Sequence, residues 1–323
     1  MKTLLSLTFF SLTFSLGAKT LDLNKVSSGS NWIMHMDFDS MRNSDVGMFL
    51  EDSFENNPEI KSKIDEMVST YGIDLRKASN FTMYGSGEKH KGIGILEGGV
   101  NASNVEKFAD SKDFISETKL GKQSVFSVEK GRHPMTYTAL KKGKMIFGPN
   151  HDYISEGILM AKGKGTGASD HPLLTSLSTL LPNPGFMFFA NLEGAGNVVE
   201  LDPRAKFMTE HIDSCGLTIG EIGGTLKVVG IMQVKSQESS VQIENMIKGG
   251  FAMMEMRKAD DRRISDLILG HAVNRTSNTV RVEMDLSIEV IIDHLEKQMK
   301  KAVGKFSKEV KLRKFPNKKY TYQ

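Results

Sequence analysis

Residues 32–39 read WIMHMDFD, and residues 186–193 read FMFFANLE. In the first stretch His35, Asp37 and Asp39 alternate with apolar side chains, and this period of two predicts a half-buried strand. The second stretch is predicted to be an apolar strand, and each strand is followed by a helix, a strand pair, a helix and a strand. The sequence therefore predicts an α+β fold with two related lobes, each a mostly antiparallel sheet covered by helices. The lobes would descend from an internal duplication, and chance similarity of two strand-helix-strand runs is the alternative.

The boundary between the lobes is predicted at residues 162–168, which read KGKGTGA and break all periodicity. A glycine-rich run of this kind is typical of a flexible linker. We therefore expect a first lobe over residues 19–161, a second lobe over residues 169–303 and a basic C-terminal tail over residues 304–323.

Apolar spacing places the individual elements within each lobe. The expected helices cover residues 46–54, 60–71, 105–109, 152–160, 169–181, 198–211, 239–256 (with more helix up to Leu269) and 288–303. The expected strands, besides the two quoted above, cover residues 81–84, 92–96, 124–128, 134–140, 144–147, 217–222, 225–234 and 279–286.

The N-terminus has the layout of a secretory signal peptide. A positive start at Lys2 precedes the apolar run Thr3–Leu16, and Gly17-Ala18 ends that run in small residues. The run is shorter than the ~20 residues that a helix needs to span a bilayer, which argues against a transmembrane anchor. We expect residues 1–18 to be cleaved near Ala18, and the mature chain to be a soluble protein of the periplasm or the extracellular space.

The composition of the chain is that of an ordinary globular protein. Its 323 residues are 39% hydrophobic and 25% charged, and the net charge of +3 indicates no specific nucleic-acid partner. With Cys215 as its one cysteine, the chain cannot form an internal disulfide. A buried small side chain is the expected role of Cys215, rather than a reactive thiol. No cofactor is predicted.

The opening strand carries a W-x-x-H-x-D pattern at Trp32, His35 and Asp37, and residues 71–74 (YGID) precede residues 81–85 (FTMYG). This arrangement resembles a group of uncharacterised secreted bacterial proteins of unknown function. Their first half, like this one, ends in a helix followed by a Gly-Lys linker, here residues 161–167. The resemblance implies the same fold and transfers no catalytic residue.

His35, Asp37 and Asp39 form the strongest candidate for a chemical site. If they share one strand face, neighbouring side chains lie roughly 7 Å apart. A histidine with two carboxylates can bind a divalent metal or perform acid–base chemistry. The alternative is a polar strand face on which Asp39 turns the chain into the next helix.

The C-terminal tail is the second candidate surface. A run of basic residues can hold an anionic bilayer or a polyanionic wall polymer. The alternative is a solvated helix face with a disordered end. The basic residues of this candidate surface are Lys300, Lys301, Lys305, Lys308, Lys311, Arg313 and Lys314.

No motif in the chain predicts a classical enzyme. The Gly-rich run at residues 163–167 lacks the P-loop spacing, and residues 84–87 (YGSG) do not form a G-x-S-x-G nucleophile motif. The sequence therefore favours a non-enzymatic, exported binding or scaffold protein, with a cleft between the lobes as the default ligand site. The alternatives are a metal-dependent envelope enzyme that uses His35, Asp37 and Asp39, and attachment to an anionic surface through the tail.

Overall fold

The fold is taken from a computed structural model, which describes residues 21–88, 91–129, 134–168, 171–193, 207, 209–260 and 266–299. The expected signal peptide, the start of the helix expected at 198–211, and the basic residues from Lys300 to Lys314 lie outside the described residues. Among the described residues, no helix combines the length and the apolar character needed to cross a membrane.

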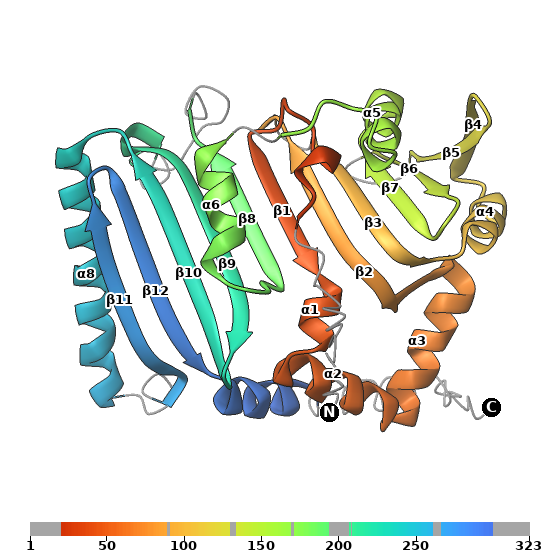
Figure 1. The fold of residues 1–323 in the computed structure, drawn as a ribbon. Coiled ribbons are helices and arrows are strands. Elements are labelled where there is room, and N and C mark those ends of the chain that lie inside the picture. Colours follow the sequence, from red (N-terminus) through yellow and green to blue (C-terminus); the bar gives the residue numbers. More distant parts are fainter. Residues whose placement is uncertain are drawn as a thin grey trace, which may run out of the picture.

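A single sheet of twelve strands organises the described part of the chain (Figure 1). The strands lie in the order β11-β12-β10-β9-β8-β1-β2-β3-β7-β6-β5-β4, and each neighbouring pair is antiparallel. Their bounds are β1 (Trp32–Asp37), β2 (Ile73–Gly85), β3 (Ile93–Val100), β4 (Ile115–Leu120), β5 (Gln123–Val128), β6 (Met135–Leu140), β7 (Lys144–Gly148), β8 (Phe186–Asn191), β9 (Ile212–Ile222), β10 (Thr225–Val234), β11 (Ile268–Thr276) and β12 (Thr279–Ser287).

Several helices begin at a side-chain cap. Ser44 caps the N-terminus of its helix by accepting from the N–H of Gly47, and Asn57 and Asn101 cap their helices in the same way. The bounds are η1 (Leu23–Lys25), α1 (Phe38–Arg42), α2 (Asp45–Glu55), α3 (Pro58–Tyr71), α4 (Ala102–Asp110), α5 (His151–Ala161), α6 (Pro172–Leu180), α8 (Gln237–Asp260) and a further helix over residues 288–299.

The predicted α+β class is confirmed, and the strands of both expected lobes belong to the same sheet. They meet at β1 and β8, where Met34 lies opposite Phe188 and Met36 lies opposite Phe186. We call this junction the seam. The expected linker, residues 162–168, is held against η1, since the N–H of Ala168 donates to the carbonyls of Leu23 and Val26. The two-lobe division and the duplication stay predictions.

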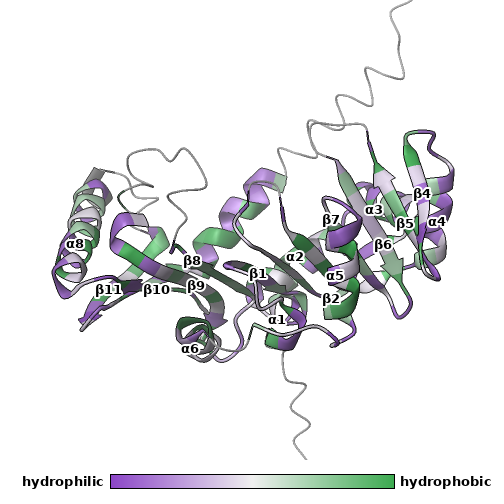
Figure 2. Ribbon diagram, turned by 90° about the horizontal axis from the view of Figure 1, so that it is seen from above, coloured by the Kyte–Doolittle hydropathy of each residue, from purple (hydrophilic) through white to green (hydrophobic). Residues whose placement is uncertain are grey.

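The two faces of the sheet are covered differently, and Figure 2 shows α6 on one side and α8 on the other. On the α5–α6 face, η1, α5 and α6 pack over a continuous apolar core that includes Ile33, Tyr84 and Phe189. On the opposite face, which we call the α4–α8 face, α4 covers one end of the sheet through Val105, and α8 covers the other end through Ile243. The centre of the α4–α8 face lies between these two clusters.

A row of apolar side chains crosses the centre of the α4–α8 face. They are neighbours in register across five strands, from β1 to β12, and each is only half-buried. The row consists of Met34, Met36, Phe186, Phe188, Leu217, Ile219, Val228 and Met284.

Candidate functional site

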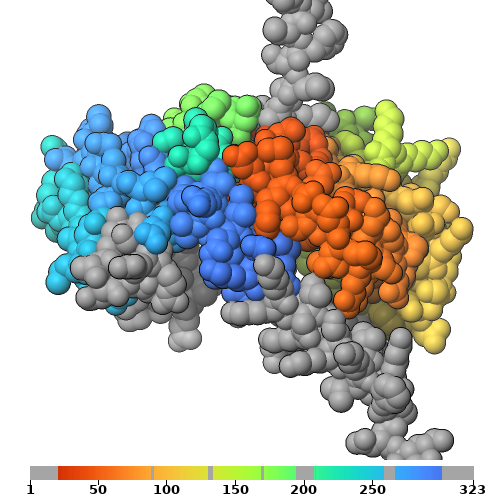
Figure 3. Space-filling model, turned by 90° about the horizontal axis from the view of Figure 1, so that it is seen from below, coloured from red at the N-terminus to blue at the C-terminus, as the bar shows by residue number. Residues whose placement is uncertain are grey.

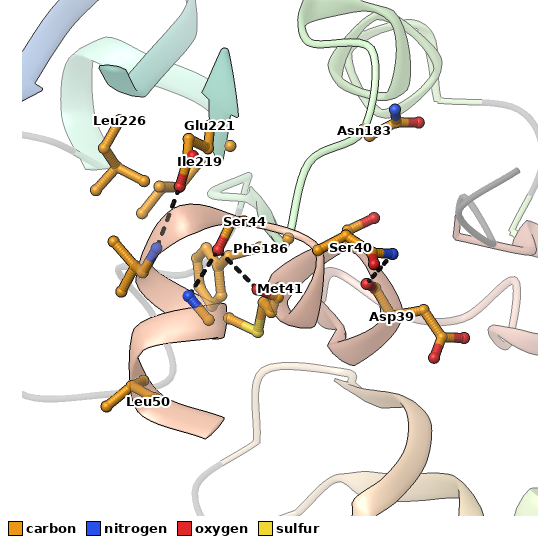
Figure 4. Close-up of a pocket in the computed structure, with 15 residues that line it drawn as sticks. Asp39, Ser40, Met41, Ser44, Leu50, Asn183, Phe186, Ile219, Glu221 and Leu226 are labelled. Carbon is orange, nitrogen blue, oxygen red and sulfur yellow. Dashed lines mark hydrogen bonds between the residues drawn. The ribbon is translucent and has the colours of Figure 1, made fainter. Parts of the chain in front are cut away.

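A pocket of about 640 Å³ lies at the lower end of this apolar row, beside the seam. Phe186, Ile219 and Leu226 form its apolar floor, and they come from the ends of β8, β9 and β10. Residues of α1 and α2 form the facing wall, so the pocket has one side from each half of the chain (Figure 4). Seen from below, the 288–299 helix lies next to the α1–α2 segment (Figure 3), as it does in Figure 1.

In the wall of the pocket, α1 and α2 pack closely against each other. A side chain on Gly47 would place its Cβ 1.8 Å from the carbonyl oxygen of Met41, so only glycine permits this approach. The hydroxyl of Ser44 donates to the same Met41 carbonyl at 2.7 Å. Met41, Ser44 and Gly47 all line the pocket, together with Val46 and Leu50 from α2.

A carboxylate from the second half of the chain fixes this wall to the floor. Glu221, at the end of β9, accepts hydrogen bonds from the backbone N–H of Asp45, at 2.9 Å to each carboxylate oxygen. The N–H of Val46 lies 3.5 Å from one of these oxygens. Glu221 therefore caps the N-terminus of α2 across the seam, where the positive end of the helix dipole favours a negative charge.

The remaining polar groups of the pocket are mostly engaged within the chain. Asp39 forms an ion pair with Arg42, whose guanidinium also donates to the carbonyl of Ala78 at 2.7 Å. The side-chain amide of Asn43 donates to the carbonyl of Asp39 at 2.9 Å. One exception is Ser40, whose hydroxyl oxygen is buried and has no hydrogen-bond partner among the described residues.

The structure separates the three residues of the predicted metal site. His35 and Asp37 lie buried on the α5–α6 face of β1, but the strand ends at Asp37 instead of continuing to Asp39. The Asp37 side chain accepts from the N–H of Ser40 at 2.9 Å and so begins α1, which carries Asp39 away from the strand face. The expectation of one strand over residues 32–39 was therefore wrong at its end.

His35 is held inside the sheet by the neighbouring strand. Its Nδ1 atom lies 2.9 Å from the hydroxyl of Thr82 on β2. Within the described ranges, no three His, Cys, Asp or Glu side chains are grouped so that they could share a metal ion. The metal role of His35, Asp37 and Asp39 stays a prediction, while Asp39 acquires a different place as a lining residue of the pocket.

Cys215 lies within β9, which begins at Ile212 and so extends before the expected start at residue 217. Its side chain is half-buried beside the core cluster under α8. Burial raises the pKa of this thiol, which keeps it protonated at neutral pH. This environment agrees with the expected packing role.

Pattern reading missed Glu221 as a site residue. It precedes the Gly223-Gly224 turn and looks like an ordinary surface carboxylate in a hairpin. Its partner, the N-terminus of α2, lies 176 residues earlier in the chain, so no local signal connects them. Ser44 also caps α2, and a local cap of this kind does not reveal that a second one comes from another strand.

Comparison with known proteins adds no assignment to this site. The chain matches no protein-family model. No curated protein matches it either. Among solved structures, it is similar to crystal form III of TP0453 with a TM-score of 0.49 and 10% identity, over 84% of this chain and 97% of that chain. Crystal form I of TP0453 gives a TM-score of 0.47 and 10% identity, over 86% of this chain and 98% of that one.

Proposed function

We propose that the protein is an exported, non-enzymatic binding protein that holds a small apolar ligand in the pocket beside the seam. The pocket carries this proposal. Its volume of about 640 Å³ lies within the ~300–1,000 Å³ that is usual for small-molecule sites. Its floor is apolar, and it opens beside a row of half-buried apolar side chains on the α4–α8 face.

The roles of the polar side chains favour binding over catalysis. Glu221 caps α2, and Asp39 is paired with Arg42. The Ser44 hydroxyl bonds to backbone groups of α1 and α2. General acid–base catalysis needs a group that is within reach of the substrate and able to exchange a proton. The pocket instead uses its carboxylates to hold its wall in place, which suits a preformed binding site.

We further infer that the two halves descend from one duplicated unit. Strand β1 is followed along the chain by the paired strands β2 and β3, and β8 is followed by the paired strands β9 and β10. The two opening strands pair antiparallel at the centre of the sheet. Such a pairing puts the ligand pocket at the junction of the two units, which is a common location for ligand sites.

The export component rests on residues 1–18, which have the layout of a signal peptide. When the full chain is expressed in a bacterium, we expect a mature N-terminus at Lys19 in the envelope or secreted fraction. Mass spectrometry of the purified protein measures this directly. A cytoplasmic protein that keeps Met1 through Ala18 would overturn the export component and leave the pocket unaffected.

The binding component can be tested with N-phenyl-1-naphthylamine, an uncharged apolar dye whose fluorescence rises in apolar surroundings. We expect saturable binding to the wild type. Leu226→Trp should weaken it at least fivefold because the larger side chain occupies the pocket floor. The matched control is Leu269→Trp, since Leu269 on β11 is 59% exposed and lies outside the pocket. Absent dye binding, or equal affinity in Leu226→Trp and wild type, would contradict the proposal.

A further inference from the structure

The charges around the pocket are asymmetric. Two of the fifteen residues that line it, Asp39 and Glu221, carry carboxylates. None of the fifteen, all of which are described, is a lysine, an arginine or a histidine. A ligand that enters the pocket therefore meets negative charge without a lining cation to balance its own.

The one natural anion site in this wall is already occupied by the chain. The N-terminus of α2 presents free backbone N–H groups and the positive end of a helix dipole, which together attract anions. The Glu221 carboxylate takes this position and accepts from Asp45 and Val46. An anionic ligand that approaches Glu221 is repelled because the charges are alike. One that displaces Glu221 breaks the hydrogen bonds from Asp45.

Arg42, which is adjacent in the chain to lining residues, is directed away from the pocket. Arg42 follows the lining residues Ser40 and Met41 but does not line the pocket. Its Nη2 atom donates to the carbonyl of Ala78 on β2 and pairs with Asp39. This arrangement neutralises part of the Asp39 charge and leaves the guanidinium committed to the neighbouring strand.

The uncharged polar groups of the pocket can serve a ligand. The hydroxyl of Ser40 has no partner within the described part of the chain, and the side chain of Asn183 is exposed at the rim. A hydroxyl and an amide can both donate to and accept from a neutral polar group. They can also accept from an ammonium group, whose charge the two carboxylates favour.

We propose that the pocket selects apolar ligands whose polar end is uncharged or cationic, and that Glu221 with Asp39 excludes anionic ones. This inference rests on the proposed binding function of the same pocket. Glu221 has two roles in it: it holds α2 as the wall of the pocket, and it sets the sign of the charge that a ligand can carry.

Two dyes with one ring system test the charge rule. N-phenyl-1-naphthylamine is neutral, and 1-anilinonaphthalene-8-sulfonate adds one sulfonate to the same skeleton. In the wild type we expect the neutral dye to bind about tenfold more tightly, because a nearby like charge raises the free energy of the bound anion. Glu221→Gln keeps an oxygen that can cap α2, and it should tighten binding of the sulfonate dye at least threefold relative to binding of the neutral dye.

Control variants separate the proposed charge selectivity from the proposed binding function. Glu51→Gln removes an exposed carboxylate from α2 outside the pocket and should leave both affinities unchanged. If Glu221→Gln lowers the melting temperature, Asp39→Asn provides a second test. It should also tighten binding of the sulfonate dye relative to the neutral dye. The charge selectivity is overturned if the wild type binds both dyes with equal affinity. It is also overturned if neither variant changes the ratio of the two affinities. Either result leaves the proposed binding function standing. Failure of the neutral dye to bind overturns the proposed function and this inference together.

Discussion

The two faces of strand β8 differ although their side chains are chemically alike. Met187 and Phe189 point to the α5–α6 face, and each is only 2% exposed. Phe186 and Phe188 alternate with them, point to the α4–α8 face and stay half-buried. The difference lies in what covers each face and not in the strand itself. Here one face of the sheet is closely packed, and the other provides the floor of the pocket that we propose as a binding site.

Close contact between helix and strand explains why the α5–α6 face is tight. Gly216 on β9 lies directly beneath α6, and a Cβ there would come within 2.3 Å of the side chain of Leu177. On the opposite face, α4 and α8 cover the two ends of the sheet. The segment with α1 and α2 reaches the centre only at the lower end, where the pocket lies.

The largest expected effect is a difference in stability between two phenylalanines of the same strand. Phe189→Ala should cost about 3–5 kcal/mol of unfolding free energy because it leaves a cavity in a close-packed core. Phe186→Ala should cost less than about 2 kcal/mol because its side chain is only half-buried. Urea denaturation of both variants measures this. Equal losses would mean that the two faces are equally packed.

Phe186 offers a second readout that Phe189 does not. It lines the pocket, so Phe186→Ala should weaken binding of the neutral dye although the protein stays folded. The dye affinity of Phe189→Ala, measured under conditions where that variant is folded, should match the wild type. The opposite pattern would move the site to the α5–α6 face.

A smaller effect is expected from the buried carboxylate of the α5–α6 face. Burial alone would raise the pKa of Glu97, but hydrogen bonds from Lys144 at 2.6 Å and Asn80 at 3.1 Å, and the charge of Lys25, outweigh it. Together they lower the pKa of Glu97 from 4.5 to about 2. Because the folded-state pKa is lowered, this stabilisation is fully present above pH ~4.5 and is lost as the pH falls toward ~2.

The pH dependence of unfolding checks this value. Over that window the wild type should lose up to about 3 kcal/mol of unfolding free energy through Glu97, because one pKa unit corresponds to about 1.4 kcal/mol. Glu97→Gln should lack this component and be less stable than the wild type at pH 7. Glu51→Gln on the exposed side of α2 serves as the control. Parallel pH profiles for wild type and Glu97→Gln would show that the carboxylate is not held by its lysines.

The smallest effect is expected on the outer side of α8. A Cβ on Gly249 or Gly250 would meet no atom within 4 Å, so nothing in the described packing requires glycine there. Gly249→Ala should raise stability by up to about 1 kcal/mol because alanine restricts the unfolded chain and favours the helix. Gly216→Ala is the comparison and should lower stability through its clash with Leu177. Thermal melting measures both changes: the melting temperature should rise in Gly249→Ala and fall in Gly216→Ala.

The sequence predicted the α+β class and most central elements because these carry regular apolar spacing. The 239–256 prediction lies inside α8, and both strands of the 217–234 hairpin were found. The edges of the sheet were missed. Strand β4 reads ISETKL and is mostly exposed, and β11 was mistaken at its start for a continuation of helix. Edge strands bury little, so their patterns are weak.

The joining of the two halves could not be read from the pattern. Alternation tells which residues share a face, but it does not tell which strand lies beside β1. The pocket depends on this pairing, because it brings Glu221 to the N-terminus of α2. His35 and Asp37 were placed correctly on one strand face, whereas Asp39 was not, because the side chain of Asp37 ends the strand by capping α1.

Methyl NMR of the methionines tests the central claim most directly, since it observes both faces of the sheet in one titration. With N-phenyl-1-naphthylamine, we expect the methyl signal of Met41, which lines the pocket, to shift and saturate with the fluorescence isotherm. Met187, buried beneath the α5–α6 face, should not shift. A shift of Met187 without Met41, or shifts confined to the exposed Met253 and Met256 of α8, would contradict the assignment of the binding site to the pocket beside the seam.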